Sequence, residues 1–394
     1  IRALKKAMAE GKQGILLVPD IALTPQMSDI VRAHFGSRVA VLHSGLSDSE
    51  RAYHWYMAMK GDVDVVVDAR SAVFAPLARL GIIIMDEEHD SSYKQEESPR
   101  YHAREVAAKR AELSGAALVL GSATPSLESY SRAKAGEMVL CELPERVDGR
   151  GLPKMVVVDR RDEIKAGNYS FLSRRLKAEM DAALMKGGRV MLFLNRRGYS
   201  PLVLCRDCGY TMKCPDCDVS LVYHSDTKTA RCHYCYHEEA VPALCPSCKS
   251  KRLKMYGVGT QRMEEELSKM FPGHGVARMD VDSTRARGSH RRILDDFKSG
   301  RAPILVGTQM IAKGLDIPEV TLVGIIAADM SLKFPDFRAA ERTYQLVTQV
   351  SGRAGRGTEP GLVIVQTYNP DHYSLKSAVE GDFKSFYETE AKSR

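Results

Sequence analysis

The stretch Leu80-Gly-Ile-Ile-Ile-Met-Asp-Glu-Glu-His89 decides the fold of the amino-terminal part of the chain. Its first six residues are apolar or glycine, and its last four are three acids and a histidine. A short apolar run that ends in acids is typical of a buried strand in a parallel sheet, which presents polar side chains at its carboxyl edge. The stretch therefore predicts an α/β domain with a functional site where this strand ends.

Other short apolar runs alternate with helix-like stretches on both sides of this strand. The first series comprises Gly14 to Val18, Val39 to Leu42, Val63 to Val67 and Ala117 to Leu120. The second series comprises Val190 to Leu194, Val276 to Met279, Ile304 to Val306, Leu322 to Ile326 and Leu362 to Gln366. Strands that alternate with helices form parallel sheets covered on both faces. We therefore expect two α/β lobes.

The composition limits the classes of protein to which the chain can belong. The chain has 394 residues, 44% hydrophobic content and a net charge of +7, which suits two or three globular domains. No apolar run approaches the roughly 20 residues that span a bilayer, so we expect a cytoplasmic protein without membrane contact. Because the chain starts at Ile1 and stops within the helix-like stretch Phe383 to Arg394, we expect a fragment at both ends.

Eight of the nine cysteines form four CxxC pairs in one module. They are Cys205, Cys208, Cys214, Cys217, Cys232, Cys235, Cys245 and Cys248. A CxxC turn presents two thiolates on one knuckle, and zinc prefers four soft ligands in a tetrahedron, so the module predicts two zinc ions. Disulfide bonds are the alternative, which a cytoplasmic location disfavours. The remaining cysteine, Cys141, is expected in the core.

The segment between Cys217 and Cys232 resembles a zinc-ribbon hairpin, which favours a nested pairing of the knuckles. In that pairing the two inner knuckles share one zinc ion and the two outer knuckles share the other. Sequential and cross-braced pairings remain open. Zinc-bound thiolates also lower the net positive charge, so any contact with nucleic acid must depend on local grooves.

Three further strings accompany the acidic strand end. Gly121-Ser-Ala-Thr-Pro-Ser126 follows the next strand, Gly307-Thr-Gln-Met-Ile-Ala-Lys-Gly-Leu-Asp316 follows a strand of the second lobe, and Gln349-Val-Ser-Gly-Arg-Ala-Gly-Arg-Gly357 follows later. In NTPases, an Asp at a strand end holds Mg²⁺, the next Glu polarises water, and arginines offset developing phosphoryl charge. An acidic helix cap and a solvated basic turn are the alternatives for the isolated strings.

These strings resemble the DExx-type, SAT and Q-x-x-GRxGR boxes of superfamily 2 helicases, and with the cysteine module nearly the whole chain resembles the PriA family of replication restart helicases. The resemblance implies an α/β fold of two RecA-like parallel-sheet helicase lobes with a two-zinc insertion in the second lobe. The implied domains are lobe 1 at 1–143, a linker at 144–170, lobe 2 at 171–204 and 249–370, the zinc insertion at 205–248, and the start of a further domain at 371–394.

The resemblance also implies the site residues. Asp86 would hold Mg²⁺, Glu87 would activate water, and Arg353 and Arg356 would offset charge on ATP. The other residues expected at the nucleotide are Glu88, His89, Gly314, Asp316 and Gln349. The residues expected at DNA are Arg70, Ser71, Tyr93, Lys94, Arg100, Tyr101, Thr308 and Gln309. For the stretch from Tyr93 to Tyr101, stacking of tyrosines on bases is the proposed role, and a plain surface loop is the alternative.

The chain departs from the family pattern in four places. The phosphate-binding loop G-x-x-x-x-G-K-[ST] is absent from the 394 residues, and the family carries it upstream with a DNA-binding domain. We therefore expect this chain to hydrolyse ATP poorly by itself. Asp20 stands where the family usually has Glu, Leu315 replaces a usual His, and Asp68 puts an acid near the proposed DNA contact at Arg70.

The function that the sequence predicts is an ATP-dependent 3′-5′ DNA helicase that restarts stalled replication forks and initiates primosome assembly. The expected partners are forked and single-stranded DNA, primosome proteins, the replicative helicase and its loader, and single-stranded DNA-binding protein, with the chain itself a monomer. The alternative is a zinc-ribbon module that binds nucleic acid or protein on a degenerate, non-hydrolysing helicase core. A related superfamily 2 translocase of a restriction or repair enzyme would share the boxes, but not this zinc spacing.

Overall fold

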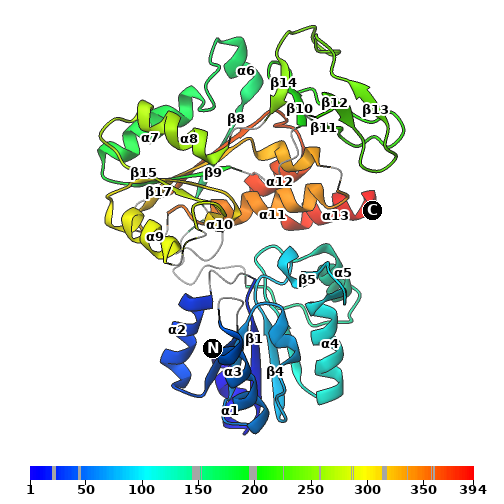
Figure 1. The fold of residues 1–394 in the computed structure, drawn as a ribbon, viewed down its shortest axis with the longest axis vertical. Coiled ribbons are helices and arrows are strands. Elements are labelled where there is room, and N and C mark those ends of the chain that lie inside the picture. The colour runs from blue at the N-terminus through cyan, green and yellow to red at the C-terminus, as the bar shows by residue number, and fades with distance from the viewer. Residues whose placement is uncertain are drawn as a thin grey trace. The chain divides into compact units, whose positions relative to one another are not determined.

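The computed structural model describes residues 1–19, 24–42, 46–143, 151, 153–194, 202–224, 226–256, 259–284, 286, 288–312, 317–334, 336–355, 357 and 360–394. Two compact units, Ile1–Cys141 and Glu142–Arg394, make up the chain (Figure 1). Five positions that the sequence singled out lie outside the described residues: Asp20, Gly314, Leu315, Asp316 and Arg356.

The first unit is built on a five-stranded parallel sheet in the order β2-β3-β1-β4-β7. Its strands are β1 (Gln13–Leu17), β2 (Val39–Leu42), β3 (Val65–Asp68), β4 (Leu80–Met85) and β7 (Ala117–Leu120). β1, β2 and β3 are buried along their whole length, as expected for strands covered on both faces. The predicted parallel sheet is confirmed.

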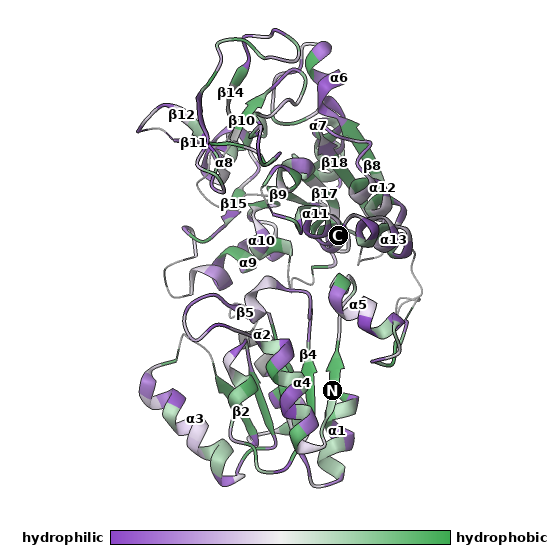
Figure 2. Ribbon diagram, turned by 90° about the vertical axis from the view of Figure 1, so that its right-hand side faces the viewer, coloured by the Kyte–Doolittle hydropathy of each residue, from purple (hydrophilic) through white to green (hydrophobic). Residues whose placement is uncertain are grey.

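Helices cover both faces of this sheet. They are α1 (Arg2–Ala9), α2 (Thr24–Phe35), α3 (Asp48–Lys60), α4 (Ala103–Ser114) and α5 (Leu127–Lys134). One apolar cluster joins α1 and α2 to the sheet, and a second joins α3 and α4 to its other face, which leaves the apolar strands between polar helix surfaces (Figure 2). After β4 the chain forms η3 (Ser91–Tyr93) and the short antiparallel pair β5 (Lys94–Gln95) and β6 (Tyr101–His102), and η2 (Ser71–Phe74) follows β3.

Capping residues explain where several of these helices begin and end. The Ser47 hydroxyl accepts a hydrogen bond from Glu50 N, and the Glu50 carboxylate accepts one from Ser47 N, which is a capping box at the start of α3. Gly61 ends α3 in the left-handed conformation with φ 82°, and Gly115 ends α4 in the same way with φ 61°. The sequence therefore sets these boundaries locally.

The second unit is built on a six-stranded parallel sheet in the order β15-β16-β9-β17-β18-β8. Its strands are β8 (Lys154–Asp159), β9 (Arg189–Leu194), β15 (Val276–Met279), β16 (Ile304–Gly307), β17 (Val320–Ile326) and β18 (Leu362–Thr367). Its helices are α6 (Arg160–Lys165), α7 (Arg174–Met185), α8 (Thr260–Met270), α9 (Ser289–Ser299), α10 (Gln309–Ala312), η4 (Ala328–Lys333), α11 (Ala339–Ser351), α12 (Tyr373–Glu380) and α13 (Phe383–Ser393). α7 and α8 pack on one face through a single apolar cluster, while α10 contacts β9, α11 contacts β17 and α12 contacts β8.

Two predicted boundaries differ from the structure. The expected linker 144–170 contains β8, which pairs in parallel with β18 along Lys154–Asp159, because its apolar run Met155 to Val158 completes the edge of the sheet. The segment 371–394, expected to start a further domain, packs on the second unit instead. Phe386 of α13 is fully buried and stacks on Tyr344 of α11 with ring centroids 4.4 Å apart.

The cysteine module forms a separate antiparallel sheet within the second unit, in the order β13-β12-β11-β10-β14. Its strands are β10 (Leu202–Cys205), β11 (Val222–His224), β12 (Thr229–Arg231), β13 (Glu238–Ala240) and β14 (Leu253–Tyr256). The module follows β9 and precedes α8 in the chain, as the sequence predicted. Across the described residues, no helix is both long and apolar enough to cross a membrane.

Candidate zinc centres and nucleotide-binding site

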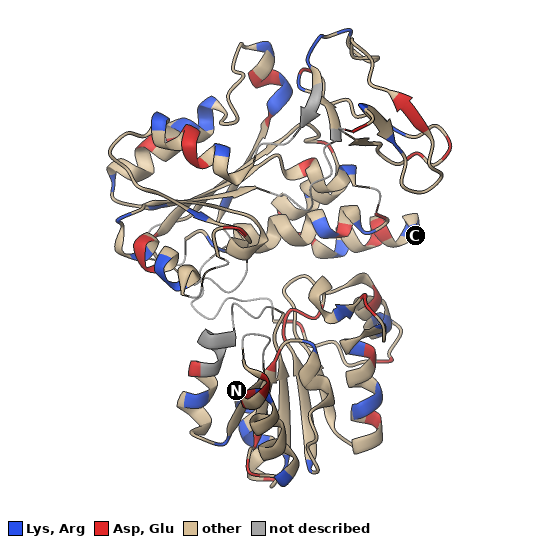
Figure 3. Cartoon of the chain, viewed as in Figure 1, with Lys and Arg blue, Asp and Glu red and all other residues tan. Residues whose placement is uncertain are grey.

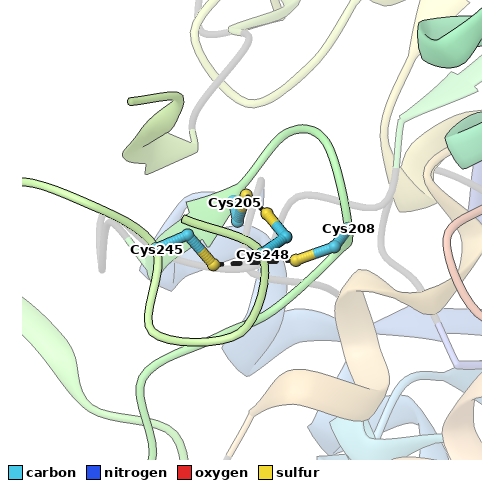
Figure 4. A group of neighbouring side chains, drawn as sticks. All are labelled: Cys205, Cys208, Cys245 and Cys248. Atoms are coloured by element: carbon cyan, nitrogen blue, oxygen red, sulfur yellow. Dashed lines mark hydrogen bonds between the residues drawn. The ribbon is translucent and has the colours of Figure 1, made fainter. Parts of the chain in front are cut away.

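Two groups of four cysteines converge in the module, in the nested arrangement. The outer group is Cys205, Cys208, Cys245 and Cys248, whose sulfur atoms point toward one another (Figure 4), and the inner group is Cys214, Cys217, Cys232 and Cys235. Sulfur–sulfur distances of 3.6 Å, 3.7 Å and 3.5 Å separate three of the pairs. A tetrahedral site with zinc–sulfur bonds of about 2.3 Å places its sulfur atoms roughly 3.8 Å apart. Both groups therefore fit a zinc ion.

Each of the four CxxC turns has the same backbone geometry. The residue after the second cysteine is left-handed in every turn: Gly209 with φ 76°, Asp218 with φ 53°, Tyr236 with φ 65° and Lys249 with φ 61°. The N–H of that residue donates to the carbonyl of the first cysteine at 2.9, 3.0, 3.1 and 2.9 Å, respectively. Only glycine adopts this conformation without steric cost, so three of the knuckles hold a strained residue. Zinc bound by the four thiolates of each group would offset that strain.

The surroundings of individual thiols differ within the two groups. Backbone N–H groups of Cys235 and Tyr234 point at the Cys232 sulfur and lower the pKa of its thiol to about 7. Burial raises the pKa of the Cys205 thiol to about 12. Each group holds thiols of both kinds, because the pKa of Cys217 in the inner group is raised to about 12 and, despite desolvation by burial, that of Cys245 in the outer group is lowered by backbone N–H groups. Zinc binds the thiolate, so both groups need the charge of the metal to lose all their protons.

The first knuckle ties the module to the parallel sheet of the same unit. The half-buried Lys333, at the end of η4, donates to Gly209 O at 2.8 Å, and Tyr368, just after β18, packs against Gly209. Leu204 completes a small apolar cluster with Tyr368 and Ile164. The outer zinc centre is therefore packed against the parallel sheet of the second unit. The expectation for the ninth cysteine was wrong: Cys141 is exposed, because it follows α5 in an open segment and not a strand.

Asp86 and Glu87 lie where β4 ends, as the sequence predicted. Asp86 N donates to Leu17 O of β1 at 2.9 Å, which holds the acid at the carboxyl edge of the sheet. The Asp86 side chain is exposed, and desolvation by surrounding protein atoms raises the pKa of its carboxyl group. Glu87 has φ 46°, a left-handed conformation that is unusual for Glu and is typical of strained functional sites.

Glu88 takes a structural position that the sequence did not predict. It is 1% exposed and accepts hydrogen bonds from Arg104 Nη1 at 3.0 Å, Ser126 N at 2.6 Å and Ser129 Oγ at 2.9 Å. His89 Nδ1 lies 2.7 Å from Ser122 Oγ. The expected nucleotide contact of Glu88 is therefore not available in this conformation, because its carboxylate joins the strand end to the segment 121–129.

Arg104 is the functional residue that sequence reasoning missed. It is 8% exposed, on α4, and its Nη1 atom donates to Glu88, Ser126 and Ser129. A buried ion pair is stable only when additional hydrogen bonds complete it, and the two serine hydroxyls do so here. The signal in the sequence was an arginine beside Ala103 and Ala107, which lie on the buried face of α4.

The residues of the first unit that were expected to contact DNA differ in their exposure to solvent. Lys94 and Arg100 are exposed and available to a ligand. Tyr93 is fully buried and donates to Asp86 O at 2.6 Å, and burial raises the pKa of its hydroxyl, so it does not offer a face to a base. Tyr101 is half-buried, with its ring against Phe74 at a centroid distance of 5.1 Å.

Arg70 and Ser71 make contacts within the protein. Arg70 donates to Ser92 O at 3.1 Å and to Lys94 O at 2.7 Å, which fixes the backbone of the segment that carries Tyr93. Ser71 Oγ donates to Asp68 at 2.5 Å. Asp68, the acid near the proposed DNA contact at Arg70, is only 2% exposed.

In the second unit the structure brings three predicted segments together. Thr308 and Gln309 lie at the end of β16 and the start of α10, both half-buried. Arg353 donates from Nε to Ala312 O at 2.9 Å, and Gln349 lies one turn earlier at the end of α11. The predicted box residues of this unit therefore cluster around α10 and the end of α11.

The backbone conformation and surroundings of Gly355 require a glycine at this position, apart from any contact with a phosphate. Its φ is 70°, its N–H donates to Val320 O at 3.0 Å, and a methyl group on its Cα would lie 2.5 Å from Gly361 N. The two glycines let two backbone segments touch beside β17 and β18. Close backbone approach therefore explains Gly355 and Gly361 without a ligand.

Domain models define the class of protein. The DEAD/DEAH box helicase model matches residues 1–133, and the helicase conserved C-terminal domain model matches residues 242–358. The structure of Mycobacterium smegmatis helicase Lhr bound to ssDNA and AMP-PNP has the same fold, with a TM-score of 0.53 at 15% identity over 95% of this chain and 42% of that chain. The two units are the two parallel-sheet, RecA-like domains of a helicase core.

The cysteine module identifies the family. The model of the PriA DNA helicase Cys-rich region matches residues 214–239, which contain the inner zinc group. The chain is 53% identical to replication restart protein PriA of Bacillus subtilis over 99% of its own length and 48% of that relative, and 49% identical to that of Synechocystis over 98% and 48%. The chain belongs to the PriA family of helicases. It spans about half the length of these curated relatives.

Zinc content of paired cysteine variants tests the nested arrangement. The double variant Cys205→Ser/Cys248→Ser damages the outer site alone, so it should retain one zinc ion per chain. Cys205→Ser/Cys214→Ser damages both sites and should retain none, because two or three thiolates bind zinc far more weakly than four. Elemental analysis by mass spectrometry gives the ratio. Sequential pairing reverses the two results, and Cys141→Ser, the control, keeps two.

Substitution of Arg104 tests the buried ion pair. Arg104→Met should lower the free energy of unfolding of the first unit by about 3–5 kcal/mol, because the Glu88 carboxylate stays buried without its cation. Urea unfolding followed by fluorescence of Trp55, the single tryptophan of the chain, reports this unit alone. The control is Arg132→Met, an exposed ion pair with Glu137, expected to cost under about 1 kcal/mol. Equal losses would contradict the account.

Alanine at Gly355 tests the close backbone approach. Gly355→Ala combines a left-handed conformation with a backbone collision, so it should destabilise the second unit by more than the roughly 1–2 kcal/mol of a left-handed alanine. The control is Gly187→Ala in the same unit, with φ 75° and open space around its Cα. Differential scanning calorimetry compares the two. The collision is excluded if both variants lower the unfolding temperature equally.

Proposed function

We propose that the protein is an ATP-dependent DNA helicase that moves 3′ to 5′, restarts stalled replication forks and initiates primosome assembly. The observation that carries this proposal is the pair of all-cysteine zinc centres within the second of two helicase domains, at the position of the PriA Cys-rich region. The relatives that share the whole chain are named replication restart proteins. A cytoplasmic, nucleoid-associated monomer suits this role.

The proposed chemistry is ATP hydrolysis by residues of both domains. Asp86 is an exposed carboxylate at a strand end, which fits the oxygen preference of Mg²⁺, and the ion would supply charge neutralisation for the phosphates. Glu87 would orient and deprotonate the attacking water. Arg353 and Arg356 would stabilise charge on the phosphate, with Gln349, Gly314 and Asp316 beside them. Glu88 and His89 would hold the segment 121–129 in register with Asp86.

The proposed contacts with DNA depend on local positive charge. Lys and Arg are interspersed with Asp and Glu over the helices of each unit (Figure 3). The exposed Lys94 and Arg100 would meet phosphates, with Thr308 and Gln309 in the second unit. The zinc module would separate strands or bind primosome proteins, the replicative helicase with its loader, or single-stranded DNA-binding protein. Its Tyr234 and Tyr236 are 61% and 74% exposed, which is typical of a contact surface.

A second candidate is a binding module on a non-hydrolysing core. The observation that favours it is the absence of a G-x-x-x-x-G-K-[ST] string from these 394 residues. Without backbone amides and a lysine around the β- and γ-phosphates, the remaining residues hold ATP weakly. We propose that the chain by itself has little ATPase activity, while a protein that carries it together with such a loop is active.

The Glu87→Gln variant tests the catalytic assignment. In a protein that carries this chain together with a phosphate-binding loop, we expect DNA-stimulated ATPase to fall about 10²–10⁴-fold, because the amide cannot accept the water proton. Affinity for single-stranded DNA should stay unchanged. Duplexes with a 3′ or a 5′ single-stranded tail then give the direction of unwinding. Wild-type turnover by the variant, or turnover by the isolated 394-residue chain, contradicts these assignments.

A further inference from the structure

A polar cavity of about 100 Å³ lies within the second unit, and its lining includes none of the zinc ligands or box residues. Its lining includes Ile326, Ala327 and Tyr368, where β17 and β18 end. Ligands of parallel α/β sheets bind outside the carboxyl ends of the strands. The cavity lies at the carboxyl ends of β17 and β18. The volume is several times that of one water molecule, so the cavity admits a small polyatomic group.

The lining of this cavity is strongly basic. Its charged residues are Arg160, Arg206, Arg252, Arg262 and Glu266. Arg262 pairs with Glu266 at 2.9 Å, and Arg252 pairs with Asp207 at 3.3 Å. Arg160 and Arg206 remain as cations without a carboxylate within ion-pair distance in the described part of the chain. The cavity therefore has an excess of positive charge that an anion would neutralise.

Two nitrogen atoms of these arginines are buried without an acceptor among the described residues. Arg160 is 5% exposed; its Nη2 donates to Ser170 O at 2.5 Å, but its Nη1 has no partner. Arg206 Nε is also buried without a partner. Buried guanidinium N–H groups are nearly always hydrogen-bonded in proteins, so both atoms indicate a missing acceptor.

Other features hold this cavity in one shape. The Arg252 guanidinium lies 3.7 Å from the centroid of the Tyr169 ring, a cation–π contact that restricts its rotation. Ala327 has φ 53°, a left-handed conformation that alanine adopts at a cost and that is typical of functional sites. Arg206 follows the zinc ligand Cys205 and donates from its backbone N to Arg252 O at 3.1 Å. The outer zinc centre therefore positions two of the arginines.

We propose that this cavity is a phosphate-binding site. Arginine forms paired hydrogen bonds to phosphate oxygens. The unpartnered atoms Arg160 Nη1 and Arg206 Nε come from different elements, so both can contact oxygens of one tetrahedral anion. The phosphate comes from the backbone of bound DNA or from a free phosphate or nucleotide. The site stands independently of ATP hydrolysis, since none of its residues belongs to the proposed catalytic set.

Binding measurements on the full 394-residue chain without ATP test this proposal. The variant is Arg206→Met, and Arg262→Met is a second variant at the cavity mouth. The control is Arg175→Met, an exposed arginine on α7 that pairs with Glu179. Retention of two zinc ions per chain shows that each variant is folded. One arm measures the melting temperature in inorganic phosphate against chloride of equal ionic strength, and the other measures anisotropy of fluorescein-labelled oligothymidylate across a salt series.

We expect phosphate to raise the melting temperature of the parent and of Arg175→Met, and to have a smaller effect on Arg206→Met and Arg262→Met. If DNA supplies the phosphate, Arg206→Met also weakens oligothymidylate binding and lowers the slope of log affinity against log salt by about 0.7 per lost contact. Unchanged DNA affinity with a lost phosphate response assigns the site to a free phosphate. The proposal is overturned if both arms give the same result for the parent, Arg206→Met and Arg175→Met.

Discussion

In a parallel sheet every strand ends at the same edge, and this constraint places the first set of candidate residues. The hydrogen bonds of Asp86 to β1 and of Gly121 to β4 bring the acidic strand end and the segment 121–129 side by side. The buried Glu88 carboxylate then connects the two segments, because it accepts hydrogen bonds from Arg104 and from Ser126 N.

The same local backbone structure occurs in all four CxxC turns of the zinc module. Each CxxC turn closes through a hydrogen bond to the first cysteine and a left-handed residue after the second, so the thiolates of a turn point the same way. Two such turns suffice for a tetrahedral site. Because Lys333 and Tyr368 hold the first turn against the sheet, metal binding and the packing of the second helicase domain are coupled.

The sequence predicted both parallel sheets, the insertion of the module, and the nested grouping of the cysteines, because periodicity and ligand spacing are local signals. It did not predict that Glu88 and Tyr93 are buried, since both belong to strings expected to face ligands. The partners of Glu88, which include Arg104 and Ser126, also lie in later segments of the chain. The sequence assigned the strand-like run Met155 to Val158 to the linker and not to the sheet, because an apolar run by itself does not show which strand it pairs with. Cys141 was expected inside, yet its segment follows the last helix of the first unit and is exposed.

The central claim is that two all-cysteine zinc centres are part of the second helicase domain. X-ray absorption spectroscopy at the zinc edge of the purified chain tests it most directly. The account predicts four sulfur neighbours for each zinc ion at about 2.3 Å and no nitrogen shell. A nitrogen shell at about 2.0–2.1 Å would contradict it, because a histidine such as His233 would then replace a cysteine in one of the two groups.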